Sequence, residues 1–283
     1  MALSRRRFLA TTSSSVVIAG MGASLGRGLP LGSVGSDGAA VPTAAPAEAA
    51  APLPDLYPTQ APALVRELVT VAHFNFARVK ELVTRQPSLA RATWDWGFGD
   101  WESALGAASH MGRRDIAELL LANGARPDLF SAAMLGQLEV VKALVAAWPG
   151  AQRIKGPHGI TLLAHARAGG ERAVPVLRYL ETLGDADQGA PTQPLGQQDR
   201  SSVLGRYRFG ALASELFIVD TYKDGLSIQR GDGMGRPLSH LGARTFSPAG
   251  AEAVRIRFSG ESPAAKLTIY DPDLVVTAQR SAG

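Results

Sequence analysis

The chain has 283 residues, of which 46% are hydrophobic, so it is long enough for two modest domains and a tail. It contains no cysteine, which excludes disulfides, thiolate metal sites, iron–sulfur clusters and a cysteine nucleophile. The formal net charge is +4, but residues 1–47 hold four arginines against one aspartate. The rest of the chain is therefore close to neutral and lacks the basic run that a nucleic-acid-binding surface would need.

The first predicted element is a leader, residues 1–54. Residues 4–9 read Ser-Arg-Arg-Arg-Phe-Leu, and the weakly apolar stretch after them, residues 10–26, is too polar for a stable membrane span. Two Ala-x-Ala sites, typical of signal cleavage, follow within residues 45–49. This order resembles a twin-arginine export signal, which implies a periplasmic or extracellular protein with no membrane span after signal removal. A disordered basic tail is the alternative interpretation.

Residues 55–184 are predicted to form paired helices. In residues 103–128, small residues lead to His-Met-Gly, Ile-Ala-Glu-Leu-Leu-Leu follows at helical spacing, and Gly-Ala-Arg-Pro-Asp closes the unit. Over about residues 62–184 this pattern resembles the ankyrin repeat. The resemblance implies an α+β multidomain fold, in which an ankyrin-like helical repeat stack is followed by a small antiparallel β-barrel or sandwich. Such a chain usually works by presenting a surface.

A glycine or asparagine is expected at the end of the first helix of each pair. The four residues in that place are Asn75, Gly112, Gly136 and Gly169. Their spacings of 37, 24 and 33 residues depart from the ankyrin period of about 33 residues. The first connection therefore carries an insertion and the second lacks a hairpin. Pro175 is expected to weaken the last helix unless it lies in the first turn.

The inserted connection, residues 94–101, holds three of the four tryptophans of the chain. We predict a partner-binding finger here because aromatic side chains in projecting loops are common in interaction sites. Its candidate residues are Trp94, Trp96, Phe98 and Trp101. The alternative is that most of the rings fold back over the first repeats, with at least one left exposed.

A second candidate strip lies on the inner helices, one residue from each predicted repeat: His73, His110, Met134 and Arg167. In an ankyrin-like stack this row faces the concave surface, where it would contact a partner. Two histidines can begin a metal site, but the sequence identifies no third ligand to converge on them. We therefore predict no metal or cofactor and interpret the row as partner-binding. His165 is expected to form structural hydrogen bonds.

Residues 185–201 form a predicted linker, and residues 202–283 a predicted small antiparallel β domain. Apolar and polar residues alternate over six candidate strands: 205–209, 215–219, 226–230, 253–258, 266–270 and 274–278. Residues 205–207, 238–246 and 278–280 resemble the accessory domain of some serine β-lactamase-like hydrolases, which implies a fold and no activity. The interior of such a barrel holds either an apolar ligand or its own side chains.

No catalytic motif accompanies these elements. The chain has no Gly-x-Ser-x-Gly, Ser-x-x-Lys with partner motifs or His-Glu-x-x-His, and residues 231–235 read as a turn between strands. We therefore predict no catalytic residue and an exported, non-catalytic scaffold for a protein or peptide partner. The alternative function is glycan or small-molecule binding by the aromatic cluster at 94–101. Neither reading involves nucleic acid.

Overall fold

The structure is a computed structural model, and it describes residues 56, 58–189, 191–272 and 274–281. All of these fall within one contact unit of the chain. The predicted leader, residues 1–54, and its export signal lie outside the described residues.

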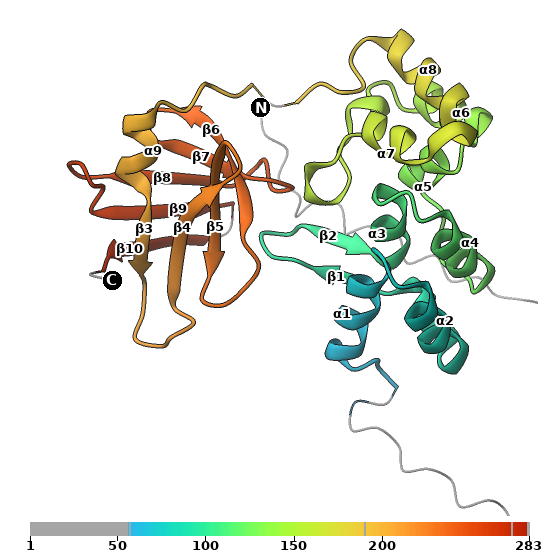
Figure 1. Cartoon of the computed structure of the whole chain (residues 1–283), viewed down its shortest axis with the longest axis horizontal. Helices are drawn as coiled ribbons and strands as arrows, with labels where there is room; N and C mark the ends of the chain where they lie inside the picture. The colour runs from blue at the N-terminus through green and yellow to red at the C-terminus, as the bar shows by residue number, and fades with distance from the viewer. Residues whose placement is uncertain (1–55, 57, 190, 273, 282–283) are drawn as a thin grey trace, which may run out of the picture. The chain divides into compact units, whose positions relative to one another are not determined.

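The helical part consists of four helix pairs with a short β-hairpin inserted after the first pair (Figure 1). The pairs are α1 (Pro62–Val71) with α2 (Phe76–Arg85), α3 (Ala104–His110) with α4 (Arg114–Ala122), α5 (Leu129–Met134) with α6 (Leu138–Ala147), and α7 (Leu162–Ala168) with α8 (Val174–Leu183). The hairpin is β1 (Thr93–Asp95) and β2 (Trp101–Ser103). Short 3-10 helices lie between these elements: η2 (Pro87–Arg91), η3 (Ala151–Arg153), η4 (Pro157–Gly159) and η5 (Gly170–Ala173).

Side-chain caps define where four of the described helices begin, and Asn75 caps α2 by accepting a hydrogen bond from the backbone of Arg78. Ser103 accepts a hydrogen bond from the backbone of Gly106, Asp128 from Ser131, and Thr161 from Ala164. The helices α3, α5 and α7 are short and rich in alanine, and α3 contacts both α1 and α5. Small residues on these faces let neighbouring helices approach closely.

Two tight turns require glycine. Gly112 and Gly136 both have positive φ angles, of 65° and 77°. A Cβ atom at Gly112 would collide with the carbonyl oxygen of Ala168, and one at Gly136 with that of Arg172. These glycines therefore set how closely the following helix pairs pack.

The fold-class prediction is wrong for the helical part. The connections differ from pair to pair: a β-hairpin follows the first, a short loop the second, and two 3-10 helices the third. No solenoid with a constant repeat is present among the described residues. Pro175 lies in the first turn of α8, where its missing N–H is not needed, so it leaves that helix intact.

The C-terminal part is a closed barrel of eight antiparallel strands, the first of the two predicted alternatives, a barrel or a sandwich. The barrel follows helix α9 (Gln197–Val203). Its strands are β3 (Gly205–Arg208), β4 (Leu216–Tyr222), β5 (Gly225–Arg230), β6 (Arg236–Gly242), β7 (Thr245–Pro248), β8 (Arg255–Ser259), β9 (Lys266–Asp271) and β10 (Leu274–Arg280). Neighbours along the chain pair with each other, and β10 closes the ring against β3.

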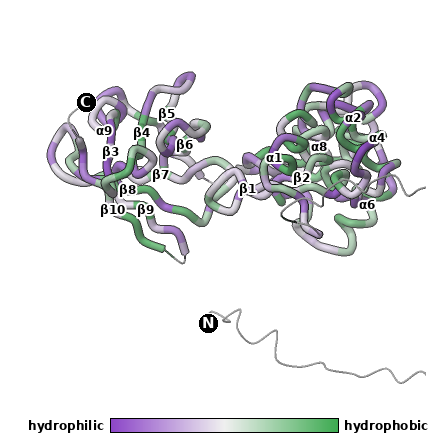
Figure 2. Tube along the Cα trace, turned by 90° about the horizontal axis from the view of Figure 1, so that it is seen from below, coloured by the Kyte–Doolittle hydropathy of each residue, from purple (hydrophilic) through white to green (hydrophobic). Residues whose placement is uncertain are grey.

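The alternation of apolar and polar residues along each strand determines which side chains fill the barrel core. In β8, Ile256 and Phe258 are buried while Arg255 and Arg257 are exposed, as the two-residue period predicts. Tyr222 pairs with Gly225 across a two-residue loop, so β4 and β5 form a tight hairpin. Figure 2 shows hydrophobic and hydrophilic stretches interleaved along the described chain. No helix within the described ranges has the length and apolar character needed to cross a membrane.

Candidate metal centre

The inserted hairpin carries a buried carboxylate to the helix ends. Its register pairs Trp94 with Glu102 and Asp95 with Trp101, and the tip is residues 96–100. Glu102 is fully buried although it lies on a two-stranded hairpin. It immediately precedes Ser103, the N-cap of α3, so the helix start holds its backbone in place. A buried carboxylate needs cationic or hydrogen-bonding partners, and Glu102 has several.

Two of these partners come from the ends of helices. His73 lies just after α1, and its Nδ1 is 3.0 Å from the carbonyl oxygens of both Val69 and Thr70. Nδ1 therefore donates its proton to backbone, which leaves Nε2 free to bind on the other side of the ring. His110 is the last residue of α3 and directs its own Nε2 at Glu102.

The third histidine comes from a loop. His158 lies in η4, between α6 and α7, with a φ of 60° that is uncommon for a residue other than glycine. Two hydrogen bonds to Asp100 hold it there: one at 2.9 Å from the backbone N–H and one at 2.9 Å from ring Nδ1. The Nε2 atom of His158 then faces Glu102.

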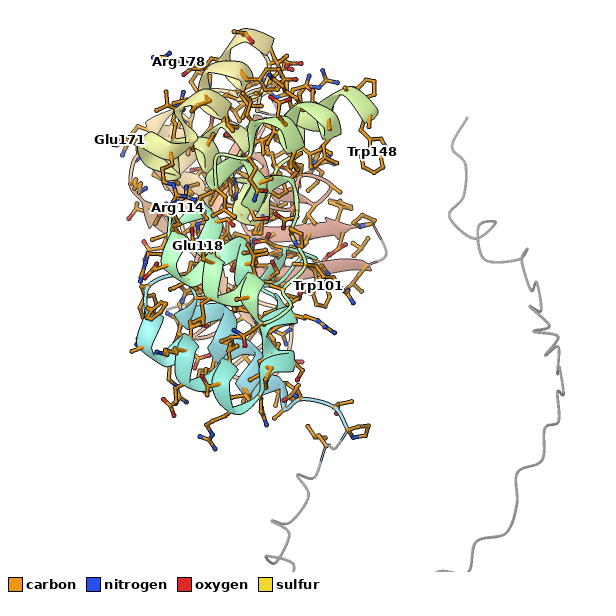
Figure 3. The ribbon with its side chains drawn as sticks, turned by 90° about the vertical axis from the view of Figure 1, so that its right-hand side faces the viewer. Trp101, Arg114, Glu118, Trp148, Glu171 and Arg178 are labelled. Carbon is orange, nitrogen blue, oxygen red and sulfur yellow. The ribbon has the colours of Figure 1, made fainter. Side chains whose placement is uncertain are left out.

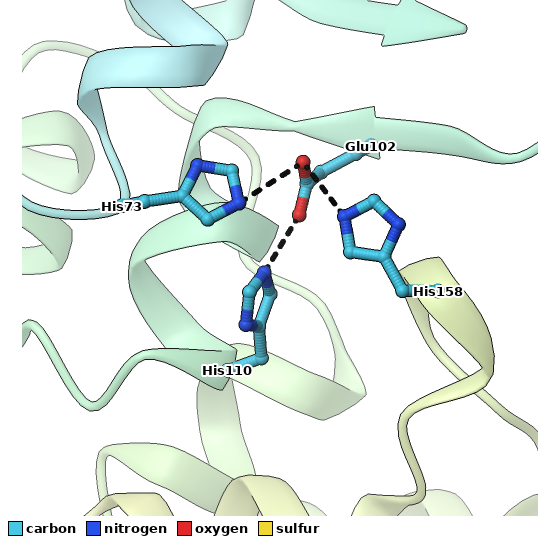
Figure 4. A group of neighbouring side chains, drawn as sticks. All are labelled: His73, Glu102, His110 and His158. Carbon is cyan, nitrogen blue, oxygen red and sulfur yellow. Dashed lines mark hydrogen bonds and ion pairs between the residues drawn. The ribbon is translucent and has the colours of Figure 1, made fainter. Parts of the chain in front are cut away.

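All three Nε2 atoms converge on the carboxylate of Glu102 (Figure 4). The nearest carboxylate oxygen lies 2.9 Å from His110, 3.4 Å from His158 and 3.5 Å from His73. One atom from each of the four residues lies within 4.8 Å of the others. His73 and His158 are partly exposed and Glu102 is buried, so an ion can enter from solvent.

A second layer of groups orients these side chains. The indole Nε1 of Trp96 donates to Glu102 at 2.7 Å. Asp100 is itself buried, and besides His158 it accepts a hydrogen bond at 2.6 Å from Nη1 of Arg236. A carboxylate behind a ligating histidine fixes the ring and makes it a better ligand, which is the usual arrangement around protein-bound metals.

The pKa values follow from these contacts. Burial alone would raise the pKa of Glu102, but hydrogen bonds from His110 and His158 outweigh it and lower the pKa to about 2. Burial would likewise lower the pKa of His158, yet the hydrogen bonds to Asp100 and Glu102 raise it to about 9. The pKa of Asp100 is lowered against its burial by His158 and Arg236. Without an ion, Glu102 is thus an anion beside a protonated His158.

The donor set fits a divalent transition metal. Three imidazole nitrogens and one carboxylate oxygen suit Zn²⁺, whose ligand atoms, with bonds of about 2.1 Å in a tetrahedron, lie about 3.4 Å apart. The Nε2 atoms of His158 and His73 lie 3.4 and 3.5 Å from the same oxygen of Glu102, Oε2, which matches that spacing, whereas Nε2 of His110 lies closer, 2.9 Å from Oε1. Three nitrogen ligands and only one carboxylate make the hard ions Ca²⁺ and Mg²⁺, which prefer oxygen ligands, a poorer fit.

The residues of the predicted inner-helix strip have different surroundings. His73 and His110 come together, with ring centroids 4.9 Å apart, as their stacked positions predict. Met134 is fully buried in the core, where its side chain does not reach the surface. Arg167 is exposed and lies 3.8 Å from Asp187. His165 is buried and its Nδ1 donates to the carbonyl of Thr161 at 2.9 Å, which confirms the predicted structural role.

The aromatic finger also divides. Trp101 is 62% exposed, whereas Trp94 and Trp96 pack against the helical core. Phe98 packs instead against the core of the barrel. The finger is therefore not one continuous aromatic surface, although one exposed ring was expected. The predicted partner-binding role of these residues stays a prediction.

Two of the four converging residues, Glu102 and His158, were not predicted from the sequence. Glu102 directly follows the inserted connection, and no motif around it predicts that its side chain is buried among histidines. His158 lies between helices, where no periodicity predicts the direction of a side chain. Its one local signal is the sequence Gly-Pro-His-Gly at residues 156–159, which is typical of a tight turn.

Comparison with known proteins does not assign the chain to a family. No family model matches the chain, and no curated protein matches it. The resemblances to ankyrin repeats, to the β-lactamase-associated domain and to the twin-arginine signal therefore stay predictions, as does export from the cytoplasm. The proposed function therefore rests on the side chains of the site.

Proposed function

We propose that this protein binds one divalent transition-metal ion, with Zn²⁺ as the best chemical match, through His73, Glu102, His110 and His158. The observation that carries the proposal is the convergence of three imidazole Nε2 atoms on one buried carboxylate. The ligands come from a helix end, a strand, a second helix end and a loop. A shared ion would account for this convergence of side chains from four separate segments.

The cluster is difficult to explain as a set of ion pairs. Protonation of all three histidines would place three positive charges around one carboxylate in a largely buried site. A neutral His73 would instead point an Nε2 lone pair at an oxygen of Glu102, because its Nδ1 proton is used on backbone carbonyls. A single cation between these atoms accepts every lone pair at once.

The ligand number supports a binding or structural role for the ion. Four protein ligands complete a tetrahedron, whereas catalytic zinc sites keep one position for water. A bound ion would tie the hairpin to the ends of α1 and α3 and to the η4 loop. This agrees with a sequence that carries no recognised catalytic motif.

Titration of Zn²⁺ into the metal-free full chain, followed by calorimetry, tests the proposal. We expect one ion per chain, and we expect His158→Asn to weaken binding by at least about 100-fold because a ligand is lost, beyond the 10–100-fold typical of second-layer changes. His240→Asn removes a buried histidine from the barrel and is the matched control, with unchanged affinity expected. Equal affinity in the wild type and His158→Asn, or no binding at all, would reject the metal site.

A second candidate function is glycan binding beside the hairpin. A groove of about 370 Å³ is lined by Trp94 and the exposed Trp101, and also by Gln60 and Asp95. Aromatic faces with amide and carboxylate groups beside them can stack on a sugar ring and bind its hydroxyls. We propose this groove as the place where the predicted aromatic cluster would act.

Tryptophan fluorescence during titration with neutral oligosaccharides tests the glycan proposal. Trp101→Ala should abolish saturable quenching. Trp148→Ala is the control, because Trp148 is 68% exposed, caps the end of α6, lies apart from Trp101 (Figure 3) and does not line the groove. Quenching that is lost equally in both variants, or that never saturates, would count against the groove.

A further inference from the structure

One end of the barrel contains a cavity of about 450 Å³. It lies where β5 and β9 end and β10 begins, and its walls are mainly apolar. The apolar wall residues include Phe209, Phe217, Ile228, Ile269 and Val276. An eight-stranded barrel is just wide enough either to be filled by side chains or to hold one small ligand. We call this cavity the barrel cup.

The rest of the barrel interior is filled. Tyr207, Phe246 and Phe258 are buried there, with ring centroids 5.5 Å apart for Tyr207–Phe258 and 5.6 Å apart for Phe246–Phe258. Phe258 pairs with Leu267 near the start of β9, whereas the cup lies at the end of β9, at Asp271. The same barrel is thus closely packed in one half and open in the other, which indicates a place for a guest molecule.

The tip of the inserted hairpin covers the cup. Trp96, Gly97 and Phe98 line it together with the strand ends. Phe98 has a φ of 58° between Gly97 at 108° and Gly99 at 74°, a conformation that is strained for a bulky residue. Contacts with the barrel core hold Phe98 in this conformation. An aromatic ring from another part of the chain therefore already packs at the mouth of the cup.

The charged groups on the rim are placed unevenly. Arg230 ends β5, stacks over Phe209 at 5.2 Å and donates from Nε to the carbonyl of Ser214. Its two Nη atoms have no hydrogen-bond partner among the described residues. Arg236 is committed to Asp100 and to backbone carbonyls. The rim acid, Asp271, is on β9, diametrically opposite β5 in the ring of eight strands.

We propose that the barrel cup binds a largely apolar small molecule carrying one anionic group, with the apolar part against Phe217 and Val276 and the anion at Arg230. The guanidinium offers the planar pair of donors that a carboxylate or sulfonate accepts. This inference rests on the barrel and does not depend on the metal centre.

Two related dyes test the proposal on the full chain: anilinonaphthalene sulfonate and its uncharged counterpart N-phenylnaphthylamine. We expect one site for each dye and tighter binding of the sulfonate. Val276→Trp fills the cup and should weaken both dyes by at least about tenfold, since the site loses its volume. Val275→Trp is the matched control, because the neighbouring Val275 is 61% exposed and lies outside the cup.

Arg230→Gln removes the positive charge at the rim but leaves the apolar walls of the cup unchanged. It should remove the preference for the sulfonate, a change of about tenfold, and leave the neutral dye unaffected. Circular dichroism and the Tm show whether each variant is folded, and a dye bound only by unfolded material rejects the cup. Equal dye binding in the Val276→Trp and Val275→Trp proteins also rejects it. An unchanged sulfonate preference in Arg230→Gln overturns the anionic part of the proposal.

Discussion

The helical part and the barrel bury different chemistry. The two carboxylates that are buried among the described residues, Asp100 and Glu102, both belong to the hairpin in the helical part, and each is surrounded by cationic or hydrogen-bonding partners. The buried polar residues from α9 onward are Ser202, His240 and Ser247. The barrel interior is otherwise apolar. The helical part therefore buries paired charged groups, whereas the barrel buries mainly apolar side chains.

The largest expected effect tests whether the two regions are energetically separate. Phe246→Ala removes a fully buried ring from the barrel and should cost about 3–5 kcal/mol of stability. Because none of the proposed metal ligands lies in the barrel, Zn²⁺ affinity should stay within twofold of the wild type, a margin of about 0.4 kcal/mol. Denaturant unfolding and calorimetry measure the two quantities. A large fall in metal affinity would show that the helical part and the barrel are energetically coupled.

Metal binding should stabilise the helical part selectively. At a free Zn²⁺ concentration of 100 times Kd, the native state should gain about 2.7 kcal/mol. Amide hydrogen exchange should show the added protection in the hairpin and in α1 and α3, and a chelator should remove it. Glu102→Gln should lose the effect, while Glu139→Gln, an exposed acid on α6, should keep it. Equal protection throughout the barrel would contradict the prediction.

The second layer should contribute less than a ligand. Trp96→Phe keeps an aromatic ring but loses the N–H that donates to Glu102. We expect Zn²⁺ affinity to fall about tenfold, at the lower end of the range for such partners. Trp94→Phe is the control, because Trp94 makes no hydrogen bond to Glu102. Affinity unchanged in Trp96→Phe would show that the indole does not orient the carboxylate.

The remaining expected effect is the pH dependence of the metal-free protein. The pKa of Glu102 falls from 4.5 to about 2, so its stabilising contribution is present above pH 4.5 and disappears as the pH falls through about 2. The pKa of His158 rises from 6.5 to about 9, so its contribution is present below pH 6.5 and disappears as the pH rises through about 9.

The two contributions together favour stability between those limits, most fully between pH 4.5 and 6.5. Thermal unfolding of the wild type and of His158→Asn, both free of metal, measures the difference. The alkaline loss of Tm should be smaller in the variant because it lacks the group that deprotonates. An identical pH profile in the two proteins would mean that His158 is not charged in the native state.

The sequence predicted regular features well and the site only in part. Alternation located β8 and β9, but β6 and β7 were absent from the candidate strands, since Pro237, Gly242 and Pro248 interrupt their pattern. Helical spacing predicted that His73 and His110 would be neighbours. It could not predict that Glu102 and His158 would join them, because the directions of those two side chains depend on a hairpin register and on a loop held by Asp100.

The order of the ligands along the chain has a consequence for synthesis. All four proposed ligands are complete by residue 158, whereas the barrel begins at Gly205 and cannot close until β10 pairs with β3. Chains emerge from the ribosome N-terminus first, at about 5–20 residues per second. An ion can therefore be captured by the nascent helical part before the last strand has been translated. The contact between Asp100 and Arg236 would then form on a hairpin that is already set.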